Sequence, residues 1–137
     1  MDFKQAIETC LRKKYADFSG RASRSEFWWF SLFTTIILAV ILVIGRAVEF
    51  VPSLAGVVPL IFGFLILVVA IGLIVPGLAV SVRRLHDTGK SGWLILIGII
   101  PIVSIVGSWV LLVFYVLPSD AKANAYGEPP LASPAAA

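Results

Sequence analysis

Three long runs of uncharged residues interrupt the polar positions of this chain. They cover 27–45, 54–82 and 93–117 and are 19, 29 and 25 residues long. A spanning helix needs about 20 residues, because the hydrocarbon core is roughly 30 Å thick and each residue rises about 1.5 Å. Lipid also requires each segment to satisfy its own backbone hydrogen bonds, which favours helices over open sheets. The pattern predicts an all-α membrane protein with transmembrane helices at about 27–45, 57–80 and 93–117.

Prolines modify two of these helices. Pro59, Pro76 and Gly77 lie near the ends of the second run, so its helix is expected to be shorter than the run, tilted or kinked. Pro101 stands about one third of the way along the third run. The pieces on either side of it are too unequal to form two spans, so a kink within one span is expected.

Composition supports a membrane environment. Hydrophobic residues make up 59% of the chain and charged residues 14%, against roughly 45–50% and about 25% in globular proteins. A small soluble domain has too much surface to hide this apolar material. The first 26 residues are polar and contain no signal-peptide pattern, so the first span is expected to serve as a retained signal anchor.

Lysine and arginine are unevenly distributed around the three runs. Nine flank the sides expected to be cytoplasmic: Lys4, Arg12, Lys13, Lys14, Arg21, Arg24, Arg83, Arg84 and Lys90. The opposite side holds Arg46 and Lys122. The positive-inside rule then places the amino terminus in the cytoplasm and the carboxyl terminus outside. Trp28, Trp29 and Trp93 would be aromatic anchors at the cytoplasmic interface.

The regions outside the spans differ in character. Segment 1–26 has apolar residues at helical spacing and basic residues on its other faces, which is typical of an amphipathic helix. Such a helix could lie in the membrane interface or pack on its own cytoplasmic loop. Segment 118–137 is rich in proline and alanine and is expected to be flexible. The domain organisation is therefore 1–26, a transmembrane domain at 27–117, and the tail 118–137.

The first polar cluster is FSGRASRSEFWWF, at 18–30. Gly20 permits a turn, and Ser23 or Ser25 could cap the first span. Glu26 would sit in the first helical turn, where the helix dipole favours an anion. Arg21 and Arg24 could reach phosphates. The simplest interpretation is a capped and anchored helix start.

The second polar cluster is VRRLHDTGKSGW, at 82–93. Arg83 and Asp87 are four positions apart and could pair on a helix. The loop is short, so the second and third helices should be antiparallel neighbours. We therefore expect a Glu26–arginine pair to link the helices. The candidate cytoplasmic cluster consists of Arg21, Arg24, Glu26, Arg83, Arg84, His86 and Asp87.

Neither cluster matches a catalytic or metal-binding pattern. His86 beside Asp87 suggests acid–base chemistry, but adjacent helical residues point in different directions and no nucleophile is aligned with them. One histidine and one cysteine, Cys10, exclude a familiar zinc cluster and an intramolecular disulfide. No catalytic residue, cofactor or metal is predicted. The runs also lack the ionisable residues that ion-coupled transporters generally need.

The order of these motifs, followed by NAYGEPP near the end, resembles the YhaH/YhaI-like family of bacterial inner membrane proteins, family 805 of the domains of unknown function. The similarity covers about 15–130. The matching positions are Gly20, Arg21, Arg24, Glu26, Phe27, Trp28, Arg83, Arg84, Leu85, His86, Asp87, Gly89, Ser91, Gly92, Trp93, Asn124, Tyr126 and Gly127. In this family the position between the last Asn and the Tyr/Phe-Gly is often basic or aromatic, whereas this chain has Ala125. The resemblance implies a multi-pass inner membrane protein with no established activity.

These observations predict a non-enzymatic accessory or scaffolding protein of the bacterial inner membrane. Its cytoplasmic face would bind anionic lipid headgroups or a membrane-protein partner, with a homo-oligomer as a further option.

The net charge of +3 is spread beside apolar runs rather than along a stripe, which argues against nucleic acid. The alternatives are a subunit of an oligomeric transporter or channel and an interfacial lipid-handling enzyme. Three spans would separate the tail motif, at 124–127, from both cytoplasmic clusters.

Overall fold

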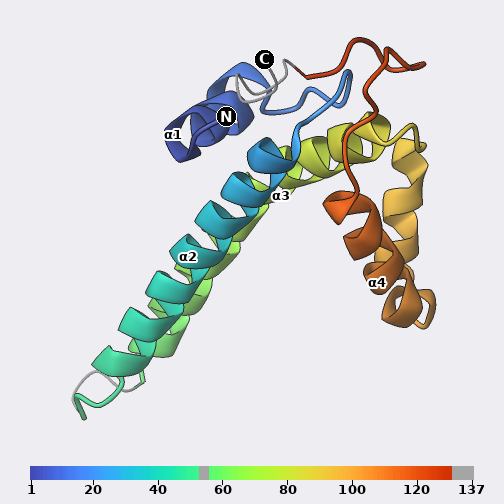
Figure 1. The fold of residues 1–137 in the computed structure, drawn as a ribbon. Helices are drawn as coiled ribbons and strands as arrows, with labels where there is room; N and C mark the ends of the chain where they lie inside the picture. The colour runs from blue at the N-terminus through green and yellow to red at the C-terminus, as the bar shows by residue number, and fades with distance from the viewer. Residues whose placement is uncertain (53–55, 131–137) are drawn as a thin grey trace.

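The computed structural model describes residues 1–52 and 56–130, and these residues are helical without a strand (Figure 1). Its elements are α1 (Phe3–Glu8), η1 (Thr9–Lys13), α2 (Arg24–Val48), α3 (Val58–Asp87), η2 (Gly92–Gly98) and α4 (Val103–Val116). The η1 segment continues α1 as a π-helical turn, and η2 is a 3-10 helix. The all-α class is thus confirmed for the described residues.

Helices α2 and α3 form a long pair that runs side by side (Figure 1). They contain 25 and 30 residues, enough to cross a hydrocarbon core of roughly 30 Å at about 1.5 Å per residue. Their most apolar stretches are only 11% and 6% buried inside the molecule. Large apolar side chains such as Val43 and Leu60 are exposed instead. Two helices with the length and composition of membrane spans therefore occur where 27–45 and 57–80 were predicted.

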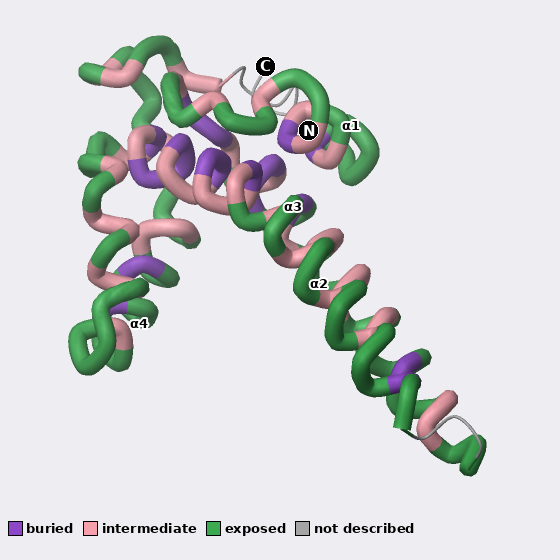
Figure 2. Tube along the Cα trace, turned by 180° about the vertical axis from the view of Figure 1, so that it is seen from behind, coloured by how far each residue is buried: buried purple, intermediate pink, exposed green. Residues whose placement is uncertain are grey.

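Helix α3 changes direction near Pro76. Figures 1 and 2 show that its last turns lie across the end of the helix pair. Proline has no N–H to donate, so the carbonyl of Gly72 loses its partner within the helix. The Tyr15 hydroxyl donates to that carbonyl at 2.6 Å. The bend thus supplies an attachment point for the amino-terminal segment, and buried residues gather at this end of the pair (Figure 2).

The expected third span at 93–117 is not one helix. The chain descends through η2, reverses and returns through α4 as a hairpin (Figure 1). Pro101 interrupts the helix, and Ile102 has a φ of 69°, which turns the backbone. Gly107 lets the two arms touch, because a Cβ there would lie 2.2 Å from the carbonyl oxygen of Ile97. The 3-10 helix η2 rises about 2.0 Å per residue and the α-helix α4 about 1.5 Å per residue. Each arm is therefore shorter than the hydrocarbon core, which is roughly 30 Å thick.

The amino-terminal helix packs on α2. Asp2 caps α1 through a reciprocal pair of hydrogen bonds with Gln5. Phe3 meets the ring of Trp29 edge-on, with centroids 5.6 Å apart, and Cys10 joins a small buried cluster with residues of α2 and α3. The helix therefore packs on α2 rather than on a cytoplasmic loop, with Lys4 exposed, and its placement in the membrane interface stays a prediction.

The described part of the tail also returns to this end of the molecule. The backbone N–H of Asp120 donates to the carbonyl of Asp87 at 3.1 Å. Residues 118–130 therefore lie beside the end of α3, near the amino-terminal segment (Figure 1). The remaining residues of the segment predicted to be flexible, 131–137, lie outside the described residues.

Candidate functional site

The bend of α3, the start of α2 and the tail meet in a compact polar structure, here called the polar cap. It consists of Arg21, Glu26, Arg83, Arg84, His86 and Asp87, together with the tail motif at 124–127. Gly20 has a φ of +74°, which permits the turn leading into the cap. The backbone N–H of Ala22 then donates to the carbonyl of Arg83 at 3.0 Å. Ser23 caps α2 by accepting from the N–H of Glu26 at 3.2 Å, and so selects one of the two predicted caps.

Glu26 forms an interhelical ion pair with Arg83, one of the arginines that the sequence left open as its partner. Nη1 of Arg83 lies 2.5 Å from Oε1 of Glu26, and both side chains are buried. The thiol of Cys10 lies 3.8 Å from the same carboxylate oxygen. Nε and Nη2 of Arg83 have no hydrogen-bond partner within the described residues. This pair joins α2, α3 and the amino-terminal segment at one point.

Asp87 binds two other arginines rather than Arg83. Its Oδ1 accepts from Nε of Arg21 at 2.9 Å, and its Oδ2 accepts from Nη1 of Arg84. All three side chains are at most 1% exposed. The predicted Arg83–Asp87 pair is therefore incorrect, because the carboxylate of Glu26 is available to Arg83 from the neighbouring helix.

Backbone carbonyls complete the coordination of these two guanidinium groups. Arg21 donates to the carbonyls of Asp120 at 2.6 Å and Lys122 at 2.9 Å. Arg84 donates to Tyr115 at 3.1 Å and also to Leu117. The last carbonyls of α4 carry partial negative charge, which favours a cation at that position. One carboxylate and a set of carbonyl dipoles thus accommodate two buried cations.

His86 connects the tail motif to the cap. Its ring stacks on Tyr126 with centroids 3.8 Å apart, and its carbonyl accepts from Nδ2 of Asn124 at 2.9 Å. Nδ1 of His86 lies 3.2 Å from the carbonyl of Gly20. Gly127 closes the turn of the motif with a φ of +117°. The three motifs form one structure, contrary to the separation that three spans required.

The remaining predicted residues lie outside this buried network. Arg24 is exposed at the first position of α2. Trp28 and Trp29 are exposed one turn further along, and Trp93 is 79% exposed at the start of η2. All three lie near the polar cap, and their role as aromatic anchors stays a prediction.

The buried arginines use most of their donors within the protein, and the two nitrogens of Arg83 that lack a partner among the described residues are themselves buried. Each donates to carboxylates or carbonyls of the chain itself, and these contacts join three segments distant in sequence. Sequence reasoning missed the carbonyl acceptors of the tail because every residue carries a carbonyl. It also missed Tyr15, although Pro76 signalled a carbonyl that needed an external donor.

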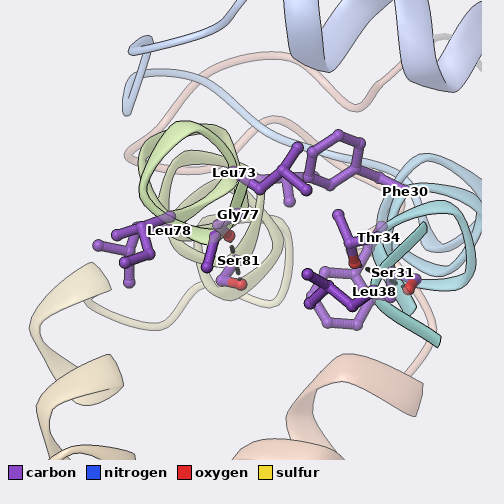
Figure 3. Close-up of a pocket in the computed structure, with 12 residues that line it drawn as sticks. Phe30, Ser31, Thr34, Leu38, Leu73, Gly77, Leu78 and Ser81 are labelled. Carbon is purple, nitrogen blue, oxygen red and sulfur yellow. Dashed lines mark hydrogen bonds between the residues drawn. The ribbon is translucent and has the colours of Figure 1, made fainter. Parts of the chain in front are cut away.

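A separate hollow of about 380 Å³ lies between α2 and α3 (Figure 3). Its walls are mainly apolar, with side chains such as Phe30 and Leu73. The hydroxyl of Thr34 donates to the carbonyl of Ser31, and that of Ser81 donates to the carbonyl of Gly77. These hydroxyls are occupied within their own helices, so the hollow provides an apolar surface.

Burial raises the pKa of the Cys10 thiol from 9.0 to about 12, and the charge of Glu26 adds to this effect. At pH 8 the reactive thiolate is then depleted by about a thousandfold relative to an unshifted thiol. We expect a maleimide to modify Cys10 very slowly in the folded protein and rapidly after denaturation, as measured by mass spectrometry. A Phe50→Cys variant in a Cys10→Ala background serves as the control, because Phe50 is exposed. Equal labelling of both thiols in the folded protein would contradict the burial.

Comparison with known proteins identifies relatives over most of the chain. The model of the family "Protein of unknown function (DUF805)" matches residues 15–128. Inner membrane protein YhaI of Escherichia coli (strain K12) is 36% identical over 122 residues, covering 86% of this chain and 89% of the relative. Inner membrane protein YhaH of the same strain is 31% identical over 123 residues, covering 89% and 93%. No solved structure gives a significant match. The chain therefore belongs to the DUF805 family, and the relatives it resembles are inner membrane proteins.

Proposed function

We propose that this chain is a non-enzymatic accessory protein of the inner membrane that gathers anionic lipid at the cytoplasmic surface. The observation that carries the proposal is the polar cap, which holds both described ends of the chain at one end of two apolar helices. In this topology α2 and α3 cross the membrane, and the η2–α4 hairpin enters it and returns. The amino-terminal segment, the cap and residues 118–130 then share the cytoplasmic side.

The distribution of charge supports this orientation. Ten of the eleven lysines and arginines belong to segments at the cap end, and Arg46 is at the other end of the helix pair. The positive-inside asymmetry is therefore stronger than for three spans, because Lys122 joins the cytoplasmic group. The hydrogen bond from Arg21 to the carbonyl of Lys122 supports this assignment, because it holds Lys122 beside the cap.

The exposed basic residues support the choice of partner. Arg21, Arg83 and Arg84 are buried, so lipid must meet the others. Arg24 is exposed at the start of α2 beside Trp28 and Trp29, and Lys90 is exposed in the turn after α3. A basic residue near an anionic bilayer contributes about 1 kcal/mol of attraction. The buried arginines of the cap hold the chain together. The exposed basic residues beside it, Arg24 and Lys90, are here called the basic rim and would contact the headgroups.

Quenching of tryptophan fluorescence by brominated lipids tests this proposal in reconstituted bilayers. We expect brominated phosphatidylglycerol to quench Trp28 and Trp29 more strongly than brominated phosphatidylcholine. Replacing Arg24 and Lys90 by glutamine removes about 2 kcal/mol of attraction and should lower this preference by up to about thirtyfold, and high salt should lower it further. The matched control is Arg46→Gln at the opposite end. No preference in the unaltered protein, or an equal loss with Arg46→Gln, would contradict the proposal.

A further inference from the structure

A pocket of about 540 Å³ lies beside the polar cap, between the end of α3, η2 and the tail. Its size falls within the range of about 300–1,000 Å³ typical of small-molecule sites. It is lined by Phe18, Val82, His86, Trp93, Leu96 and Tyr126, with Ser91, Gly92 and Ile95 completing the walls. We refer to it as the His86 pocket.

The ring of His86 presents a hydrogen-bond acceptor to this pocket. The carbonyl of Gly20 can only accept, so Nδ1 of neutral His86 carries the proton that joins them. Nε2 then carries a lone pair, and no described residue donates to it. Gly92 keeps the adjacent space open, because a Cβ there would lie 3.1 Å from Nε2. A ligand that binds here would supply a hydroxyl or N–H group.

The other walls limit the class of ligand. Among the described residues no carboxylate lines the pocket, so these walls offer no counter-ion to a full positive charge. Ser91 provides a hydroxyl near the cap, while Ile95 and Leu96 provide apolar surface further along η2. The pocket thus passes from polar to apolar along the hairpin, which matches the order of head and acyl chain in a lipid.

We infer that the His86 pocket binds a single glycerolipid whose hydroxyl group donates to Nε2 of His86. The acyl chain would follow Val82 of α3 and then Ile95 and Leu96 of η2. The direction of the chain into the bilayer rests on the membrane placement proposed above. The pocket itself is distinct from the exposed basic rim, because the contact is one specific hydrogen bond rather than charge attraction.

The full-length protein in detergent micelles allows a direct test. Trp28, Trp29 and Trp109 are replaced by phenylalanine, so that fluorescence reports Trp93 at the pocket wall. The probe is a monoacylglycerol with a brominated acyl chain, and its methyl ester without hydroxyls is the control ligand. We expect saturable quenching by the monoacylglycerol and clearly weaker binding of the ester.

Two variants test the assigned contacts. Asparagine at position 86 retains a donor for the carbonyl of Gly20 and lacks Nε2, so His86→Asn should weaken monoacylglycerol binding by about tenfold and leave ester binding unchanged. Leu96→Phe should weaken both ligands by filling the pocket. Val106→Phe, on the exposed surface of α4, is the matched control and should change neither.

Two controls distinguish specific binding in the His86 pocket from misfolding of the variants and from non-specific lipid contact. Protection of Cys10 from maleimide verifies that each variant keeps the cap folded. Non-saturable quenching that is equal for both lipids, or unchanged affinity in both His86→Asn and Leu96→Phe, would overturn the pocket assignment. The assay uses micelles and an uncharged lipid, so its result does not depend on the phosphatidylglycerol preference that tests the proposed function.

Discussion

Replacement of Asp87 by asparagine is expected to destabilise the protein by about 3–5 kcal/mol. Arg21 and Arg84 both bind this carboxylate, and all three side chains are buried. Asparagine has nearly the same shape, but its amide offers one acceptor where the carboxylate offers two. Two guanidinium groups would then remain in the interior without a counter-charge. Thermal unfolding of the purified protein in detergent measures the loss.

An exposed ion pair in the same chain provides the control. Arg46 and Glu49 lie 3.1 Å apart, and the Arg46 side chain is 72% exposed. Solvent screens such pairs, so Glu49→Gln should cost at most about 1 kcal/mol. A similar small effect of both substitutions would mean that the buried ion pairs do not hold the cap together. A large effect of Asp87→Asn alone supports the role of the cap in joining three segments.

The lengths of the uncharged runs and the positions of the charged residues were sufficient to predict the two long helices and the polar cluster at their ends. The runs that became α2 and α3 are the right length for a bilayer, and their ends carry the residues that form the cap. A pair between Glu26 and an arginine of the second cluster could also be predicted, because a short loop and antiparallel helices bring these segments together, but the choice of Arg83 could not. These features depend on side-chain chemistry and sequence spacing, which are visible in the sequence.

The hairpin and the returning tail depend on features that the sequence does not display. A run of 25 apolar residues is long enough for one span, and Pro101 alone does not distinguish a kink from a reversal. The reversal requires the left-handed backbone of Ile102 and the close contact of Gly107 with Ile97. The tail is fixed by carbonyls that accept from Arg21, and carbonyls occur at every position. Both features therefore emerge only when the chain is folded.

The position of the tail has a consequence for membrane topology that chemical labelling can measure. Phe50 is 88% exposed at the end of the helix pair opposite the cap, and Lys122 is exposed on the tail. In the proposed topology the first position lies outside the cytoplasm and the second inside. We expect an impermeant maleimide to label Phe50→Cys in intact cells and to leave Lys122→Cys at background. Both should be labelled once the membrane is opened.

Three spans would give a different result, because Lys122→Cys would then be labelled in intact cells together with Phe50→Cys. The native thiol does not confuse the measurement, since Cys10 is buried and its pKa is raised to about 12. Lys4→Cys is a further control, because α1 packs beside the cap and should behave like the tail. Labelling of Lys122→Cys but not Lys4→Cys in intact cells would show that the tail crosses the membrane. That outcome cannot coexist with the hydrogen bonds from Arg21 to the tail carbonyls, so one labelling experiment decides between the hairpin and a third span.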